Sequence, residues 1–193
     1  METKITLRAK RRAIAQTTMA ALFAALIAAG AFISIPLPFS PVPVTLQNLF
    51  ALLSGLILGP LPGGAAAALF LLAGALGVPV FSGAVGGFAH FFGPTGGFLL
   101  GYLLAALTAG FIAGRPRGNR QASLLRIILA VLAGFLVVYV PGVIRLKVVL
   151  DTDWGKALAV GFIPFAIGDT LKGIAAVLIA PRLRRVAAEQ TDG

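Results

Sequence analysis

The chain has 193 residues, of which 59% are apolar and only 11% are charged, and it contains no cysteine. Soluble domains are about 45–50% apolar and about 25% charged, so this composition excludes both a soluble globular fold and a disordered chain. The lack of cysteine excludes a disulfide scaffold, a thiol nucleophile and a Cys-ligated metal. The sequence therefore predicts an integral membrane protein with a single membrane domain over residues 1–193.

The formal net charge of +10 comes from 16 Lys and Arg against 6 Asp and Glu. Most basic residues form three clusters, which lie before the first apolar run, at a polar break in mid-chain and after the last apolar run: Lys4, Arg8, Lys10, Arg11, Arg12; Arg115, Arg117, Arg120, Arg126; Arg182, Arg184, Arg185. Clusters at the ends of apolar segments are what the positive-inside rule produces. No nucleic-acid-binding motif accompanies them, so the sequence predicts no nucleic-acid partner.

Apolar runs predict the elements in chain order, since a membrane-spanning helix needs about 20 mostly apolar residues. Six spans are expected, at about 13–35, 45–58, 65–80, 98–113, 124–144 and 164–183. Proline and glycine content predicts a stiff loop over 36–43, a tight turn over 59–64 and an interrupted stretch over 81–97. Residues 154–162 are expected to lie at the membrane interface, because Trp favours headgroup depth and Pro164 suits the first position of the last helix.

The even number of spans places both termini on the same side of the membrane. The three basic clusters then all lie in the cytoplasm, in the tails 1–12 and 184–193 and in the loop after the fourth span. The loop after the fifth span lies outside and mixes both charges: Arg145, Lys147 and Lys156 with Asp151 and Asp153. The prediction is an all-α membrane protein with six transmembrane helices, N-in and C-in, embedded over about 13–183. A cleaved signal peptide is the disfavoured alternative, because the first apolar run is longer than a typical signal sequence.

Motifs of common enzymes are missing from the sequence. It has no Walker A pattern, no HExxH and no GxSxG, and its only histidine, His90, has no acidic residue nearby to hold it as a general base. The sequence therefore predicts no enzyme, no catalytic residue, no metal and no cofactor.

Asp169 and Lys172 are the only charged residues well inside a predicted span. Their i, i+3 spacing places them on one helix face, close enough to pair. Charges in a membrane cost about 2.5–3.5 kcal/mol each on insertion scales and usually mark a ligand or ion pathway, so a binding role is favoured over a purely structural pair. If the last helix begins at Pro164, Asp169 lies roughly 8 Å below its outer end. A site there would open to the outside.

Further candidate site residues lie at the outer ends of other spans. Thr45 and Gln47 follow the proline-rich loop; Thr45 also suits a helix cap, whereas a buried Gln47 amide needs a polar partner. In and after the interrupted stretch, glycines allow a ligand to approach the backbone while Phe92 and Phe98 offer an apolar wall. Tyr139 is a further hydroxyl candidate in the fifth span.

Small residues four apart line the first span: Ala20, Ala21, Ala24, Ala25, Ala28 and Ala29. Such a strip allows close packing of another helix. Internal packing and docking of a partner protein remain equal alternatives for it.

Three blocks in order carry a family resemblance: Pro43-Val-Thr-Leu-Gln47, Gly93-Pro-Thr-Gly-Gly97 and Pro164-Phe-x-x-Gly-Asp-x-x-Lys172. They resemble the BioY family, the biotin-specific substrate-binding (S) components of energy-coupling factor (ECF) transporters, over about residues 13–185. The resemblance implies the six-helix S-component fold, located in the cell membrane, and high-affinity capture of biotin at the outer face. It also implies an ECF-type ABC transporter in which one transmembrane T component and two ABC ATPases are the partners, with Ala21 and Ala25 on the face that contacts the T component. The chain departs from the family pattern in two places, the uncharged turn 60–62 and Phe98 in place of a tyrosine.

Biotin offers a ureido head with two N–H donors and a carbonyl, an apolar thioether ring and a carboxylate tail. Asp169 can accept the ureido N–H groups, and Lys172 can neutralise Asp169 and donate to the ligand. Thr45, Gln47 and Tyr139 can complete the polar contacts, and Phe92 or Phe98 can form the wall of the apolar slot. Together with the ion pair, these residues make up the predicted biotin site. Two rival functions stay open: a small secondary transporter for biotin or a similar vitamin that couples Asp169 to a proton or sodium ion, and a scaffold subunit that binds no small molecule.

Overall fold

Seven α-helices, one short 3-10 helix and one β-hairpin make up the part of the chain that the computed structural model describes. That part is residues 2–116 and 121–192, with the side chains of residues 2–5, 7–9, 191 and 192 left aside. The elements in order are α1 (Glu2–Ala29), β1 (Ser34–Leu37), β2 (Ser40–Thr45), α2 (Gln47–Leu58), α3 (Pro60–Ala75), η1 (Phe88–Phe92), α4 (Gly96–Ala113), α5 (Leu124–Val149), α6 (Trp154–Gly161) and α7 (Ile163–Asp192).

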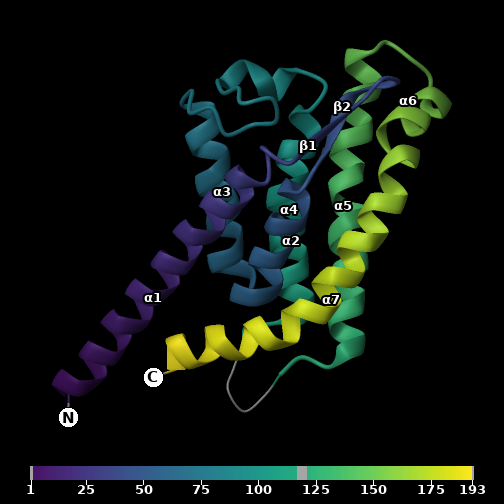
Figure 1. Cartoon of the computed structure of the whole chain (residues 1–193). Coiled ribbons are helices and arrows are strands. Elements are labelled where there is room, and N and C mark those ends of the chain that lie inside the picture. The colour runs from purple at the N-terminus through teal and green to yellow at the C-terminus, as the bar shows by residue number, and fades with distance from the viewer. Residues whose placement is uncertain (1, 117–120, 193) are drawn as a thin grey trace.

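The long helices pack against one another as one bundle, and both termini lie at the same end of it (Figure 1). The β-hairpin, η1 and α6 lie at the opposite end (Figure 1). Among the described helices, α1, α4, α5 and α7 contain segments long and apolar enough to cross a membrane. Helices α2 and α3 are apolar but have only 12 and 16 residues, or about 18 and 24 Å at 1.5 Å per residue. The structure thus has four clear candidate spans and two shorter helices where the sequence predicts six spans.

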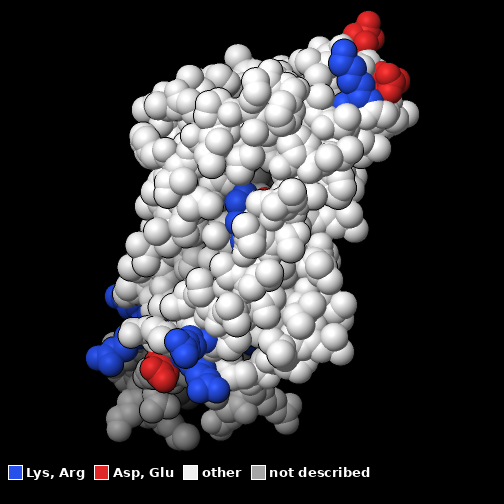
Figure 2. All heavy atoms as spheres, turned by 45° about the vertical axis from the view of Figure 1, so that its right-hand side comes forward, with Lys and Arg blue, Asp and Glu red and all other residues white. Residues whose placement is uncertain are grey.

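The surface is suited to lipid. Figure 2 shows charged side chains gathered at the two ends of the molecule, with a wide uncharged band between them that is broken by a recessed cationic group. Large apolar side chains are exposed on the long helices, among them Ile167 at 77% and Leu136 at 63%. Such a belt is unfavourable in water and favourable in hydrocarbon, so the predicted membrane class is confirmed.

The predicted tight turn over 59–64 is wrong. Only Gly59, with φ +86°, separates α2 from α3, and Pro60 opens α3. The first helical position has no intrahelical partner for its N–H, so proline is well tolerated there. A side chain on Gly63 would come within 2.6 Å of the Gly55 Cα, so the two helices approach as closely as glycine allows.

The proline-rich segment forms a hairpin, so the protein is mostly helical and not entirely helical as predicted. Helix α1 ends at Ala29, before the expected boundary at residue 35, and β1 pairs with β2 antiparallel, with Ser34 opposite Thr45. A two-stranded hairpin leaves one edge of each strand unpaired, where proline forfeits no ladder hydrogen bond. The prolines therefore fit a hairpin as well as they fit a loop.

Helices α6 and α7 occupy the end of the chain. The separate helix α6 lies in the predicted interfacial stretch, and α7 begins one residue before Pro164, as expected. At the start of α6, Asp153 Oδ1 accepts a hydrogen bond from the backbone N–H of Lys156 at 2.9 Å, and this bond lowers the pKa of the Asp153 carboxyl.

The last helix does not end at about residue 183, where the sequence predicts the end of the last span. Helix α7 continues through Pro181 to Asp192, so the expected tail 184–193 is helical as far as the structure describes it. The helix bends in its last part (Figure 1), where Pro181 removes a hydrogen bond from the helical ladder. The loop predicted after the fourth span includes residues 117–120, which lie outside the described residues.

Close packing of α4 on α5 positions the side chains considered next. A Cβ on Gly97 would lie 2.1 Å from the Pro141 carbonyl oxygen, and one on Gly101 would lie 2.8 Å from that of Val138. Because both positions lack a side chain, the two backbones meet. Phe98 of α4 and Tyr139 of α5 lie near this contact, with their ring centroids 6.4 Å apart.

Candidate ligand-binding site

The charged pair lies on α7, near the end of the bundle away from the termini. Lys172 Nζ is 2.7 Å from Asp169 Oδ1, and the two side chains are only 9% and 7% exposed. The i, i+3 spacing predicts this ion pair, and the structure confirms it. Burial makes such a pair costly unless further hydrogen bonds satisfy both groups.

Asn48 and Tyr139 supply those further hydrogen bonds. Asn48 Nδ2 donates to both Asp169 oxygens, at 2.9 and 3.0 Å, and Asn48 Oδ1 accepts from Lys172 Nζ at 2.9 Å. The Tyr139 hydroxyl donates to Asp169 Oδ2. An ionised carboxylate has about four acceptor positions, so Asp169 is fully satisfied by protein donors from α2, α5 and α7.

A small pocket adjoins this network and is covered by the hairpin. Its lining comes from β2, α2, α4, α5 and α7: Val42, Pro43, Thr45, Asn48, Phe98, Tyr102, Val138, Tyr139, Phe165, Asp169 and Lys172. Its cavity volume is about 20 Å³, room for roughly one water molecule. The pocket combines a charged floor with aromatic walls, and β2 closes it.

Five of the predicted site residues meet at this pocket: Thr45, Phe98, Tyr139, Asp169 and Lys172. The Thr45 side chain also shares a hydrogen bond with Tyr102. Since these residues come from four separate elements, the fold brings together what the sequence places far apart.

Gln47 and Phe92 lie elsewhere. Gln47 is 1% exposed, and its Nε2 donates to the Val80 carbonyl at 3.2 Å instead of facing the pocket. Phe92, on η1, is 61% exposed; Arg145 donates to its carbonyl and lies over its ring. Their roles in ligand binding stay predictions.

Sequence reasoning missed Asn48 and Tyr102. Asn48 directly follows Gln47 in an apolar helix, so the argument that a buried amide needs partners applies to it equally. Tyr102 lies one helical turn after Phe98 and is one of only two tyrosines in the chain. The sequence thus contains a signal for each residue, but neither signal tells which side chain faces the ion pair.

The alanine strip of α1 has two faces. Ala20 is buried at 4% exposure, and Ala24 and Ala28 pack partly buried against the core. Ala21 and Ala25 are exposed on the other side of the helix. One row therefore serves internal packing, and the other lies on the surface.

The groups that line the pocket are suited to recognising a polar ligand. The pocket offers a carboxylate, an ammonium, an amide and two phenol groups, with aromatic rings beside them, and its lining holds no nucleophile paired with a base. Across the described residues, no three His, Cys, Asp or Glu side chains gather to hold a metal ion. A multi-pass helical protein with such a pocket near one face of the membrane belongs to the class of small-molecule-binding membrane components.

The model of the BioY family matches residues 1–189, and the chain belongs to this family. It is 41% identical over 175 residues to the biotin transporter BioY of Thermotoga maritima, covering 91% of this chain and 99% of that protein. It is 40% identical over 169 residues to the probable biotin transporter BioY of Pyrococcus horikoshii, covering 88% and 96%.

The fold is similar to a solved crystal structure, that of the S-component for biotin from an ECF-type ABC transporter. The two superpose with a TM-score of 0.79 at 31% sequence identity, over 89% of this chain and 92% of the other. The fold described above is therefore the S-component fold.

Proposed function

We propose that the chain captures biotin at the outer face of the cell membrane with high affinity and delivers it for uptake as the S component of an ECF-type ABC transporter. It is a transporter component and not an enzyme. The observation that carries the proposal is the buried Asp169–Lys172 pair, held by Asn48 and Tyr139 beneath β2 in a chain of the BioY family.

Recognition would proceed by exchange of hydrogen bonds. The Asp169 carboxylate already accepts four, so each ureido N–H of biotin replaces one protein donor rather than filling an empty site. The displaced Tyr139 hydroxyl and the Lys172 ammonium are then available to the ureido carbonyl. Phe98 and Phe165, whose ring centroids are 6.3 Å apart, offer an apolar wall to the thioether ring.

Access to this pocket requires movement of the hairpin. Small-molecule pockets typically enclose about 300–1,000 Å³, whereas this one has about 20 Å³. Val42 and Pro43 of β2 are among the lining residues, so displacing β2 opens the pocket toward the end of the bundle away from the termini. Gln47, at the start of α2, and Phe92, on η1, would join the site if these segments rearranged together with the hairpin.

The proposed topology is one domain over 1–193 with six crossings, by α1, α2, α3, α4, α5 and α7. Both termini lie in the cytoplasm, because the basic clusters gather at their end of the bundle. Helix α6 then rests at the outer interface. Packing within the bundle supports the crossings of the short helices α2 and α3, since most of α2 is buried.

The proposed partners are one transmembrane T component, which docks on the exposed Ala21 and Ala25 face, and two ABC ATPases. The chain has no Walker A motif, so the energy for uptake must come from other chains. Small side chains four apart on a lipid-facing helix allow another helix to approach closely. Membrane lipid covers the rest of the belt, and nucleic acid has no part in this function.

Labelled-biotin binding to the purified chain alone tests the proposal. Saturable binding is expected that unlabelled biotin displaces and lipoate does not, because lipoate shares the carboxylate tail but lacks the ureido head. No binding would leave the scaffold alternative. Uptake by cells that express this chain without ATPases would favour the ion-coupled alternative.

A further inference from the structure

Arg145, near the outer end of α5, is a half-buried cation with no carboxylate partner among the described residues. Its guanidinium donates a hydrogen bond to the backbone carbonyl of Phe92 and lies 5.9 Å from the centroid of the Phe92 ring. The Nε of Arg145 is buried and has no hydrogen-bond partner. A buried donor without an acceptor is costly, and a guanidinium presents its donors in a planar fork that matches a carboxylate. This group is therefore suited to bind an anionic ligand.

Arg145 lies on the pocket side of α5. It follows Val138, which lines the pocket under the hairpin, by seven residues, and this spacing of two helical turns returns to the same helix face. A Cβ on Gly97 would lie 2.7 Å from the Arg145 Cβ, and the next residue of α4, Phe98, belongs to the pocket lining. Arg145 therefore lies beside α4 and η1 on the outward side of the pocket.

The distance along α5 fits the length of biotin. The Tyr139 hydroxyl donates to Asp169, where the ureido head is proposed to bind. Arg145 follows Tyr139 by six residues, about 9 Å toward the outer end at 1.5 Å per residue. By ordinary bond lengths, an extended biotin spans roughly 10 Å from its ureido ring to its carboxylate. A biotin with its head at Asp169 therefore has its tail at the depth of Arg145.

Two other cations described at this end of the bundle are placed differently. Lys147 lies over the Trp154 ring, with its Nζ 5.3 Å from the ring centroid. Two residues separate it from Arg145, a rotation of about 200° around the helix axis, so it points away from the pocket. Lys156 is exposed on α6 and lies close to the Asp153 carboxylate. Of these three cations, Arg145 is the one on the pocket side.

We propose that the Arg145 guanidinium binds the carboxylate of biotin on the outward side of the pocket, in exchange for its hydrogen bond to the Phe92 carbonyl. This assignment rests on the proposed function, since it requires the ureido head to lie at Asp169. A carboxylate accepts two parallel hydrogen bonds from a guanidinium, and one of them can come from the unpaired Nε. Such a charge-assisted pair is stronger than the bond to a neutral carbonyl that it replaces. Arg145 therefore makes the site specific for ligands that carry a free carboxylate.

Competition by biotinamide tests this assignment, because biotinamide keeps the ureido head and the length of the tail but has no charge on the tail. Unlabelled biotin and biotinamide are each used to displace tritiated biotin from the purified chain. For the wild type, we expect at least about tenfold tighter binding of biotin than of biotinamide, which corresponds to ~1.4 kcal/mol. Arg145→Gln should lower this ratio to near one, chiefly by weakening the binding of biotin. Lys147→Gln is the matched control, because it removes an equal charge from the same helix end and should keep the wild-type ratio.

A wild-type ratio near one would overturn the assignment. If Arg145 only holds η1 in place, Arg145→Gln weakens both ligands by the same factor and the ratio survives, which would overturn it as well. An equal fall of the ratio in Lys147→Gln would show long-range attraction instead of contact, with the same consequence. If Arg145→Gln is not monodisperse, Arg145→Lys, which keeps the charge but loses the planar fork, should lower the ratio at least about threefold. An unchanged ratio in Arg145→Lys would then contradict the assignment.

The proposed function is read from a different quantity in the same measurement. Saturable binding of biotin to the wild type supports it whatever the ratio is. Failure of the wild type to bind biotin would contradict the proposed function and this assignment with it. A failure of the assignment alone is therefore distinguishable.

Discussion

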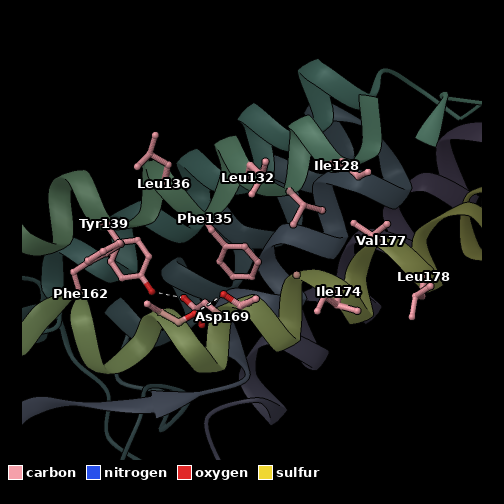
Figure 3. Close-up of a pocket in the computed structure, with 14 residues that line it drawn as sticks. Ile128, Leu132, Phe135, Leu136, Tyr139, Phe162, Asp169, Ile174, Val177 and Leu178 are labelled. Carbon is pink, nitrogen blue, oxygen red and sulfur yellow. Dashed lines mark hydrogen bonds between the residues drawn. The ribbon is translucent and has the colours of Figure 1, made fainter. Parts of the chain in front are cut away.

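The hydroxyl of Tyr139 on α5 donates a hydrogen bond to Asp169 on α7, at the point where the pocket under the hairpin meets an apolar groove between these helices. Both residues line both spaces. Figure 3 shows this hydrogen bond, which joins α5 to α7.

Replacement of Tyr139 by phenylalanine should lower the free energy of unfolding by about 1.5–3 kcal/mol, the usual value for a hydrogen bond to a charged group. Biotin affinity should fall as well, since one donor for the ureido carbonyl is lost. Thermal unfolding and labelled-biotin binding measure the two effects. Tyr102→Phe is the matched control for stability, because it removes a hydroxyl that pairs with the neutral Thr45. Unchanged stability and affinity in Tyr139→Phe would contradict the role given to this hydroxyl.

Arg184 fastens the bent end of α7 to the rest of the bundle. It is 1% exposed and donates to the carbonyls of Leu56, Ala113 and Gly114, at the C-terminal ends of α2 and α4. Carbonyls at helix C-termini lack intrahelical donors and favour a cation.

Arg184→Gln should therefore destabilise the protein by about 3 kcal/mol, the value of one or two charge-assisted hydrogen bonds. Arg11→Gln, at an exposed position of α1, should change stability by less than about 0.5 kcal/mol. Thermal unfolding of both variants in the same detergent measures these two changes in stability. A similar loss in both, or in neither, would remove Arg184 from this capping role.

The exposed alanine row of α1 predicts a separation of binding from uptake. Ala21→Trp should abolish biotin uptake in cells with the complete transporter, because a large side chain prevents close helix approach. The purified variant should still bind biotin with nearly unchanged affinity, since Ala21 is exposed on α1 and is not among the residues that line the pocket. Leu104→Trp, at an exposed position of α4, should leave uptake intact. Parallel loss of binding and uptake in Ala21→Trp would indicate misfolding instead of a docking face.

The orientation is testable with single cysteines, because the chain has none of its own. Lys156→Cys, on α6, should react with an impermeant thiol reagent added to intact cells. Glu189→Cys, on the last part of α7, should react only after the cells are opened. Labelling of Glu189→Cys from outside would contradict the N-in, C-in topology.

Hydropathy, charge placement and the i, i+3 spacing suffice to predict the membrane class, most helix positions and the ion pair. They act locally, and each is visible in a short window of sequence. The hairpin at β1 and β2 was not predicted, because proline is equally compatible with a loop and with the unpaired edge of a two-stranded sheet. Helix α3 was predicted five residues too late, because Pro60 was assigned to a turn although it suits a first helical turn.

The partners of the ion pair could not be derived in the same way. Asn48 and Tyr102 carry local signals, but only the packing of α2 and α4 around α7 decides that one contacts Asp169 and the other shares the pocket. Arg184 resembles the other basic residues at the end of the chain. Its burial depends on helix ends that are distant in the sequence, so its role is visible only in three dimensions.

The affinity of the purified chain for labelled biotin, compared between the wild type and Asp169 variants, tests the central claim most directly. Asp169→Asn leaves the Lys172 ammonium buried without its counter-ion, and loss of one member of a buried pair typically costs about 3–5 kcal/mol. We predict at least about a hundredfold weaker binding for Asp169→Asn, at 1.4 kcal/mol per factor of ten. The double variant Asp169→Leu with Lys172→Met removes both charges, so neither is left buried without its partner. If that double variant is monodisperse and binds biotin with wild-type affinity, the ion pair is structural and the proposed site is wrong; if it is monodisperse and does not bind, the site stands.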